Sequence, residues 1–326
     1  MWKLLAAVNK KLVIAIPVMM TAGFLFGVSQ DPEIVRSLRK LILPLTFLMV
    51  YPMMVTLDFK RLKDGISNFR IQISALIINF MIIPFLAYAL GTFFLADRPY
   101  MALGLLLVAL LPSSGMTISW TGFAKGNTGA AFNLTAIGLL AGSLAAPLYI
   151  QWLMGTRVDV DPVMMSRQIL YIVFIPMIAG YLTRKMLLSR FSPTEFKEKV
   201  APRFPALSTI GVLAIVFVAL AMKASTITAN PKILAAIVAP LLIFYVVNFS
   251  VSTLIGRFFF TRDDAVALVY GTVIRNLSIA LAIAMNTFGS TGSDAALIIT
   301  ISYIIQVQSA AWFIKLADFV FVPSGH

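Results

Sequence analysis

The feature that most constrains this fold is a repeated hydropathy pattern of ten long apolar segments separated by short polar connections. Sixty per cent of the 326 residues are hydrophobic and 12% are charged. About twenty apolar residues in a helix cross the hydrocarbon core of a bilayer, and a helix satisfies its own backbone hydrogen bonds there. The pattern predicts an all-α polytopic membrane protein with ten transmembrane helices. The ten predicted spans are Lys11–Val28, Leu41–Leu57, Ile71–Leu90, Met101–Phe123, Thr128–Leu153, Ile169–Leu188, Leu207–Met222, Ile233–Phe258, Ala265–Phe288 and Ala295–Leu316.

Composition argues against an enzyme. The chain has no cysteine, and its single histidine is the last residue, His326. All 13 acidic residues fall in predicted loops or at the ends of predicted spans, so no carboxylate is expected at mid-membrane. General acid–base chemistry and thiolate ligation therefore lack their side chains. We expect no catalytic residue, no metal site and no cofactor.

The charge distribution sets the expected topology. The net charge of +13 comes mostly from Lys and Arg in loops on the side of the N-terminus, as the positive-inside rule requires of cytoplasmic loops. This pattern favours a multi-pass protein of the cytoplasmic membrane with both termini cytoplasmic. The lipid bilayer is the expected partner, nucleic acid is not, and the oligomeric state is left open.

The ten predicted spans form two halves of five, and a long polar connection at 189–205 follows the first span of the second half. An odd number of spans in each half reverses the orientation of the second half, which gives an inverted 5+5 repeat. The predicted division is 1–188 for the first repeat plus span 6, 189–205 for a cytoplasmic linker, and 206–326 for the rest of the second repeat, all within one transporter unit.

Two spans in corresponding places of the halves are predicted to be interrupted. Span 4 carries Pro112, Ser113, Ser114 and Gly115 in a row, and proline, serine and glycine each weaken a helix. Span 9 carries Arg275 followed by an asparagine at its middle. Paired interrupted spans are the best sequence indication of a transporter binding site. We therefore expect spans 4 and 9 to be broken, crossing helices at such a site.

Arg275 is the strongest single candidate for a binding residue. An arginine at mid-membrane costs free energy to bury and therefore faces a cavity or a partner. It could bind an anionic solute, serve as a built-in cation among helix-end carbonyls, or make a structural hydrogen bond to carbonyls with no ligand. Two further polar residues, Ser119 and Asn133, are expected to make interhelical hydrogen bonds. The predicted substrate- and ion-binding residues are Asn79, Ser113, Ser114, Thr117, Thr135, Arg275, Asn276 and Ser278.

Four stretches carry a family resemblance. They are FLMVYPMM from Phe47, NFMIIP from Asn79, LPSSGMTISW from Leu111 and RNLSIALAIA from Arg275. Together they resemble the bile acid/sodium symporter superfamily, most closely its arsenical-resistance (arsenite efflux) branch. The resemblance covers nearly the whole chain. It implies ten spans, a panel domain, a core domain, and crossed broken helices four and nine at the site.

The chain departs from that family at several positions. The arsenite-efflux branch has a cysteine where this chain has Ser113 and a glutamate where it has Ser278. The sodium symporters have an acid at the place of Gly271 and a glutamine at the place of Arg275. The resemblance places sodium ligands at Thr117 and Thr135, but the other substitutions argue against two sodium ions at the usual sites. We expect Arg275 to replace a sodium charge, so that coupling is altered or lost.

The sequence thus predicts secondary transport of a small, anionic organic solute by alternating access, with one domain rocking against the other. Arg275 and the half-helix N-termini would hold the anion, and the coupling ion, Na⁺ or H⁺, is left open. Two alternatives remain: efflux of metalloid oxyanions or hydroxides without a thiolate, and a passive facilitator or channel.

Overall fold

A computed structural model describes residues 12–57, 69–159, 161–289 and 291–321 of the chain. These residues are almost entirely helical and include no β-strand. Seven helices among them, some built of consecutive segments, are long and apolar enough to cross a membrane. The prediction of an all-α polytopic protein is confirmed. The seven are Pro32–Thr56, Phe69–Phe94, Thr128–Met154, Pro162–Arg190, Pro193–Ala229, Lys232–Phe259 and Gly292–Val320.

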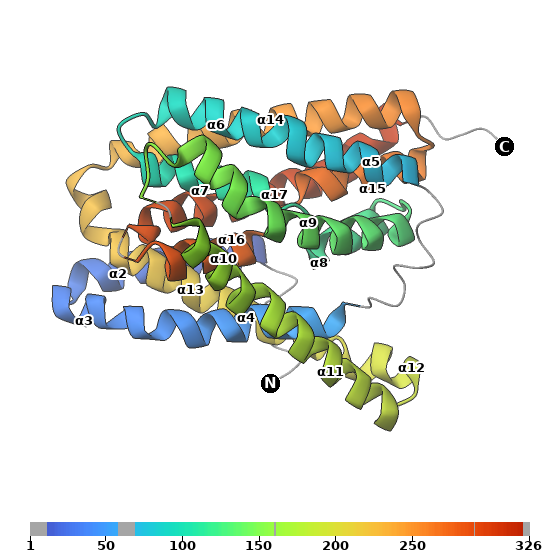
Figure 1. Ribbon diagram of the computed structural model, residues 1–326, viewed down its shortest axis with the longest axis horizontal. Helices are drawn as coiled ribbons and strands as arrows, with labels where there is room; N and C mark the ends of the chain where they lie inside the picture. The colour runs from blue at the N-terminus through green and yellow to red at the C-terminus, as the bar shows by residue number, and fades with distance from the viewer. Residues whose placement is uncertain (1–11, 58–68, 160, 290, 322–326) are drawn as a thin grey trace. The chain divides into compact units, whose positions relative to one another are not determined.

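The other three predicted spans contain shorter helices (Figure 1). The first corresponds to α2 (Leu12–Ser29), and its predicted start at Lys11 lies outside the described residues, as do the two chain termini. Predicted spans 4 and 9 are each divided into two short helices. The divided helices are α7 (Pro99–Leu110), α8 (Gly115–Phe123), α15 (Arg262–Val273) and α16 (Leu277–Thr287). The predicted interruptions are therefore observed, whereas the count of ten crossings and the inverted repeat stay predictions.

The polar connection at 189–205 is largely helical. The helix before it, α11 (Ile175–Arg190), is followed by the short α12 (Pro193–Glu195) and a π-helical turn, Phe196–Val200. Ser192 and Glu195 form a reciprocal capping box that starts α12. The next long helix, α13 (Arg203–Ala229), begins before the predicted span 7.

The chain forms two compact units that interleave its two halves. Unit 1 comprises Met1–Asp58, Val163–Leu234 and Ser278–Thr300, and unit 2 comprises Phe59–Pro162, Ala235–Leu277 and Ile301–His326. This partition by contacts is a different one from the predicted division by repeats, which stays a prediction. Both interruptions lie in unit 2.

Unit 1 is held together by close helix packing at small residues. Its helix α13 packs against α2 and against α4 (Ile42–Thr56), and α4 also packs against α11. A Cβ atom at Gly211 would lie 2.6 Å from the backbone nitrogen of Met49, so α13 approaches α4 backbone to backbone. Small residues allow such approach in membranes, where lipid provides no hydrophobic drive for helix association.

Unit 2 surrounds the two interruptions with four further long helices. Contacts join α6 (Ile83–Phe94) to α7, and α9 (Thr128–Met154) to α7, α8 and α15. The remaining helices, α14 (Lys232–Phe259) and α17 (Gly292–Val320), run side by side in the same direction. Ring contacts between Phe249 and Phe313, and the approach of Gly256 to Phe321, fix this parallel register.

Candidate functional site at the paired helix interruptions

The first interruption is capped by its own sequence. Helix α7 ends at Leu110, and α8 begins at Gly115 with Ser114 as its N-cap. The Ser114 hydroxyl accepts the Met116 N–H at 3.2 Å, and the Ser114 N–H donates to the Thr117 hydroxyl at 3.1 Å. These two bonds satisfy donors that a helix start otherwise leaves open. Predicted site residues Ser114 and Thr117 therefore both serve the start of α8.

The second interruption lies against the first. Helix α15 ends at Val273 and α16 begins at Leu277, and the extended residues between them form an antiparallel bridge with the first interruption. The Ser113 N–H donates to the Ile274 carbonyl and the Asn276 N–H donates to the Leu111 carbonyl, both at 2.7 Å. Backbone that leaves a helix in a membrane must find such partners within the protein. Each interruption thus provides hydrogen-bond partners for backbone groups of the other.

At the second interruption, the backbone N–H and carbonyl of Arg275 face away from the first interruption and hydrogen-bond to a side chain. The Arg275 N–H donates to the Gln306 Oε1 at 2.7 Å, and the Gln306 Nε2 donates to the Arg275 carbonyl at 3.3 Å. Gln306 comes from α17, and its Oε1 also accepts the Tyr245 hydroxyl of α14 at 3.2 Å. One side-chain amide thus pairs with the Arg275 peptide as a neighbouring β-strand would.

The Arg275 side chain is fully buried, with 0% of its surface exposed. Its Nη1 donates to the Asn79 Oδ1 at 2.9 Å and to the Ala109 carbonyl at 3.1 Å. The guanidinium carbon lies 5.8 Å from the centre of the Phe244 ring, within cation–π range. Its Nε and Nη2 atoms, however, are buried with no hydrogen-bond partner, and no ion pair of the described residues involves Arg275. The guanidinium is anchored at one nitrogen and unsatisfied along its other edge.

A proline-induced π-helical segment positions Asn79. Pro84 has no N–H, and the carbonyl four residues earlier, that of Phe80, instead accepts the Tyr149 hydroxyl at 2.6 Å. The segment Ile77–Ile82 is π-helical, a local widening frequent at functional sites. Asn79 lies within it and is 3% exposed.

The Gly271 carbonyl links Asn79 to Ser113. It accepts the Ser113 hydroxyl at 2.7 Å and the Asn79 Nδ2 at 3.4 Å. A Cβ atom at Gly271 would lie 2.6 Å from Leu134 Cδ1 of α9, so α9 leaves little room for a side chain there. Ser113 has a φ of 62°, a conformation uncommon for residues other than glycine.

The structure therefore brings most of the predicted site residues into one unit. Asn79, Ser113 and Arg275 meet directly, and Thr135 of α9 places its hydroxyl 3.5 Å from the Ser114 carbonyl. Ser278 is assigned to unit 1 and is half-buried. Of the two residues expected to bond between helices, Ser119 is exposed and Asn133 has a buried Oδ1 without a partner.

Sequence reasoning missed the residues that support the second interruption. Gln306 and Tyr245 lie in other spans and are buried, as is Asn248, whose Nδ2 donates to the Thr272 carbonyl at 3.1 Å. The sequence signal that could have indicated them is a side-chain amide, such as that of Gln306 or Asn248, within an apolar span. Nothing in the sequence shows which peptide that amide meets.

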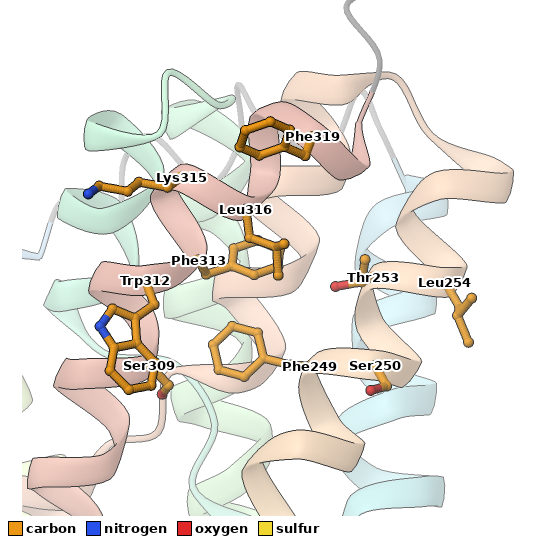
Figure 2. A pocket seen from close by; sticks show the side chains of 10 residues that line it. All are labelled: Phe249, Ser250, Thr253, Leu254, Ser309, Trp312, Phe313, Lys315, Leu316 and Phe319. Carbon is orange, nitrogen blue, oxygen red and sulfur yellow. The ribbon is translucent and has the colours of Figure 1, made fainter.

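A separate groove lies on unit 2 between α14 and α17 (Figure 2). It has a volume of about 720 Å³, and Phe249 and Phe313 contact each other along it. Trp312 and Phe319 at its edge are 68% and 84% exposed. No predicted site residue lines the groove, which is thus distinct from the interrupted helices.

Long apolar helices, together with two paired helix interruptions, define a polytopic membrane protein of the transporter class. The profile of the Sodium Bile acid symporter family matches residues 43–230, more than half of the chain. The chain belongs to this family. It is thus a membrane transporter of a small solute and not an enzyme.

Several curated relatives are similar over much of their length. The arsenical-resistance protein Acr3 of Corynebacterium glutamicum is 25% identical, over 76% of this chain and 70% of the relative. The uncharacterized transporter slr0944 of Synechocystis is 24% identical, over 83% and 76%. The uncharacterized sodium-dependent transporter YocS of Bacillus subtilis is 27% identical, over 52% of this chain and 50% of its own.

Proposed function

We propose that the chain is a secondary transporter of a small organic anion. In this proposal ten spans form an inverted 5+5 repeat in the cytoplasmic membrane, and alternating access moves the solute across it. The two helix interruptions of unit 2 form the binding region. Arg275 supplies the positive charge, and the N-terminus of α8 supplies a favourable dipole.

One observation carries the proposal: the free edge of the buried Arg275 guanidinium. The protein anchors Nη1 and leaves Nε and Nη2 without partners. These two nitrogens form the fork that binds a carboxylate with two parallel hydrogen bonds. A buried cation with unpaired donors destabilises the folded state unless an anion binds to it. A solute carboxylate or similar oxyanion would therefore bind along this edge.

The same arrangement supports altered or lost sodium coupling. Asn79 Oδ1 and the Ala109 carbonyl are oxygen ligands of the kind that hard cations use, and here both accept from the guanidinium. A fixed positive charge already occupies this place. Sodium binding beside it would bring two cations together in a buried region.

Thermal unfolding of the purified protein tests the proposal. A ligand that binds the folded state raises its melting temperature by mass action. Pyruvate, succinate and taurocholate would be tested in sodium and in potassium salts. At least one anion should stabilise the wild type equally in both, and Arg275→Gln should abolish the effect.

Arg257→Gln is the matched control, because Arg257 is an exposed arginine at the end of α14. It should retain the stabilisation by the anion. Stabilisation that requires sodium would overturn the loss of coupling. No anion stabilising the wild type, or undiminished stabilisation in Arg275→Gln, would overturn the anion site.

Metalloid efflux is the second candidate, favoured by two relatives that are named arsenical-resistance protein Acr3. A site for it would rely on hydroxyl and amide groups, although the Ser113 hydroxyl is already bonded to the Gly271 carbonyl. Stabilisation by arsenite or antimonite, but by none of the organic anions, would favour this candidate. Solute flux into vesicles that does not saturate would instead indicate a passive facilitator.

A further inference from the structure

We infer that Gln306 is a positioning residue: it clamps the Arg275 peptide so that the guanidinium presents its free edge in one direction. This inference rests on the proposed anion site. Gln306 acts through the main chain, and none of its recorded bonds goes to the guanidinium.

The clamp is complete at both ends of the Gln306 amide. Its Oε1 accepts from the Arg275 N–H at 2.7 Å and its Nε2 donates to the Arg275 carbonyl at 3.3 Å. Tyr245 holds the same Oε1 from α14. All three side chains are at most 2% exposed, so water is a poor substitute for these partners.

The clamp also completes the backbone of the interruption. Ile274 and Asn276 pair with the first interruption, which leaves the N–H and carbonyl of Arg275 facing the other edge. Without Gln306 these groups would be buried and unpaired, and the peptide could rotate to seek other partners. Rotation of the Arg275 peptide would redirect its side chain. Anion affinity should therefore depend on Gln306, which does not itself bind the anion.

Gln306→Glu gives a test of the clamp that needs no solute. A protonated carboxyl has one donor and one acceptor and reproduces both bonds of the amide, whereas a carboxylate cannot donate to the Arg275 carbonyl. The neutral acid therefore keeps the clamp, and the carboxylate loses it. The stability of Gln306→Glu should therefore be greatest at low pH, where the acid is neutral, and should decrease as rising pH ionises it.

The expected result is a melting temperature of Gln306→Glu, relative to wild type, that decreases between about pH 5 and pH 8. The charged or titratable side chains recorded around this position are Arg275, Tyr245 beside Gln306, Tyr303 near Tyr245, and Tyr270, which bonds to Ala310. A melting temperature that rises with pH would show that the new carboxylate pairs with the guanidinium. That sign would overturn the clamp.

Gln306→Leu tests positioning against a general loss of stability. It removes both bonds at similar volume, and Thr300→Val is the control. Thr300 lies on the same helix, is fully buried, and bonds to the carbonyl of Ala296 one turn earlier. In vesicles, Gln306→Leu should raise the KM for the anion found above, pyruvate or taurocholate for example, by about tenfold or more. The maximal rate should change less, and Thr300→Val should change neither value.

The outcomes separate this inference from the proposed function. Loss of anion binding in Arg275→Gln but an unchanged KM in Gln306→Leu would overturn the positioning role and leave the anion site intact. If no anion binds the wild type, the proposed function fails and the positioning role fails with it. The pH-dependent stability of Gln306→Glu would then still decide whether the peptide clamp exists.

Discussion

The two helix interruptions of unit 2 are stabilised in different ways. At the first, Ser114 and Thr117 cap α8 from within four residues of chain. At the second, Gln306 of α17 bonds to the peptide of Arg275, and Asn79 of the π-helical segment accepts a hydrogen bond from one nitrogen of its side chain. Beside the backbone bridge that both share, the first interruption is capped locally, whereas the second is supported by distant helices.

This difference assigns different roles to the two interruptions. A locally capped interruption changes little when its surroundings move, because its partners move with it. An interruption that depends on several helices has a conformation that those helices determine together. The buried charge lies at the second interruption, where movement of α14 or α17 would change its environment. We expect the first interruption to act as the fixed support and the second as the responsive element.

The largest effect should come from a change that forces the interruptions out of contact with α9. A Cβ atom at Gly142 would lie 2.6 Å from the Leu110 carbonyl and 3.0 Å from Pro112 Cδ. Gly142→Val should destabilise the protein by more than about 3 kcal/mol and prevent folded protein from accumulating. Purified yield and size-exclusion profile measure this. The control is Gly115→Ala, where an added Cβ meets nothing within 4 Å. Normal yield of Gly142→Val would show that the first interruption can shift away from α9.

Removal of the anchor at the second interruption should have the next largest effect. Asn79→Leu deprives the buried Nη1 of its 2.9 Å acceptor at similar volume. The expected loss is about 2–3 kcal/mol, because an acceptor of a buried charged group is removed. Unfolding in mixed detergent micelles measures the free energy. Asn79→Asp should be more stable than Asn79→Leu, since its carboxylate can pair with Arg275, and it should weaken anion binding. A loss below about 1 kcal/mol in Asn79→Leu would mean that water or another group replaces the amide.

Removal of the charge itself should separate stability from function. Arg275→Met eliminates the buried Nε and Nη2 donors while the peptide keeps its bonds to Gln306. Replacing a poorly satisfied buried charge with an apolar side chain should stabilise the fold by about 1–3 kcal/mol. Transport of the anion should be lost. The same unfolding assay measures the stability, and uptake into vesicles measures the transport. A destabilised Arg275→Met would indicate that the guanidinium is a structural element with no vacant edge to fill.

The sequence anticipated the local part of this comparison. A proline followed by two serines and a glycine predicts an interruption, because each of these residue types weakens a helix. Arg275 marked the second interruption, since a charge within an apolar span demands a special environment. The supports of Arg275 were not predictable, because Gln306 and Tyr245 reach it through tertiary packing. The contact of Asn79 with the guanidinium likewise joins residues that are remote in sequence.

The smallest effect should come from the local cap. Ser114→Ala removes the acceptor for the Met116 N–H but leaves the Ser114 N–H bonded to Thr117, and the bridge between the interruptions is formed by other residues. Loss of an N-cap acceptor typically costs about 1 kcal/mol. Unfolding in mixed micelles should show that loss, whereas Ser119→Ala, an exposed change on the same helix, should stay within about 0.5 kcal/mol of wild type. A loss in Ser114→Ala as large as that in Asn79→Leu would show that both interruptions depend on one shared network. The distinction between a local support and a responsive element would then have to be abandoned.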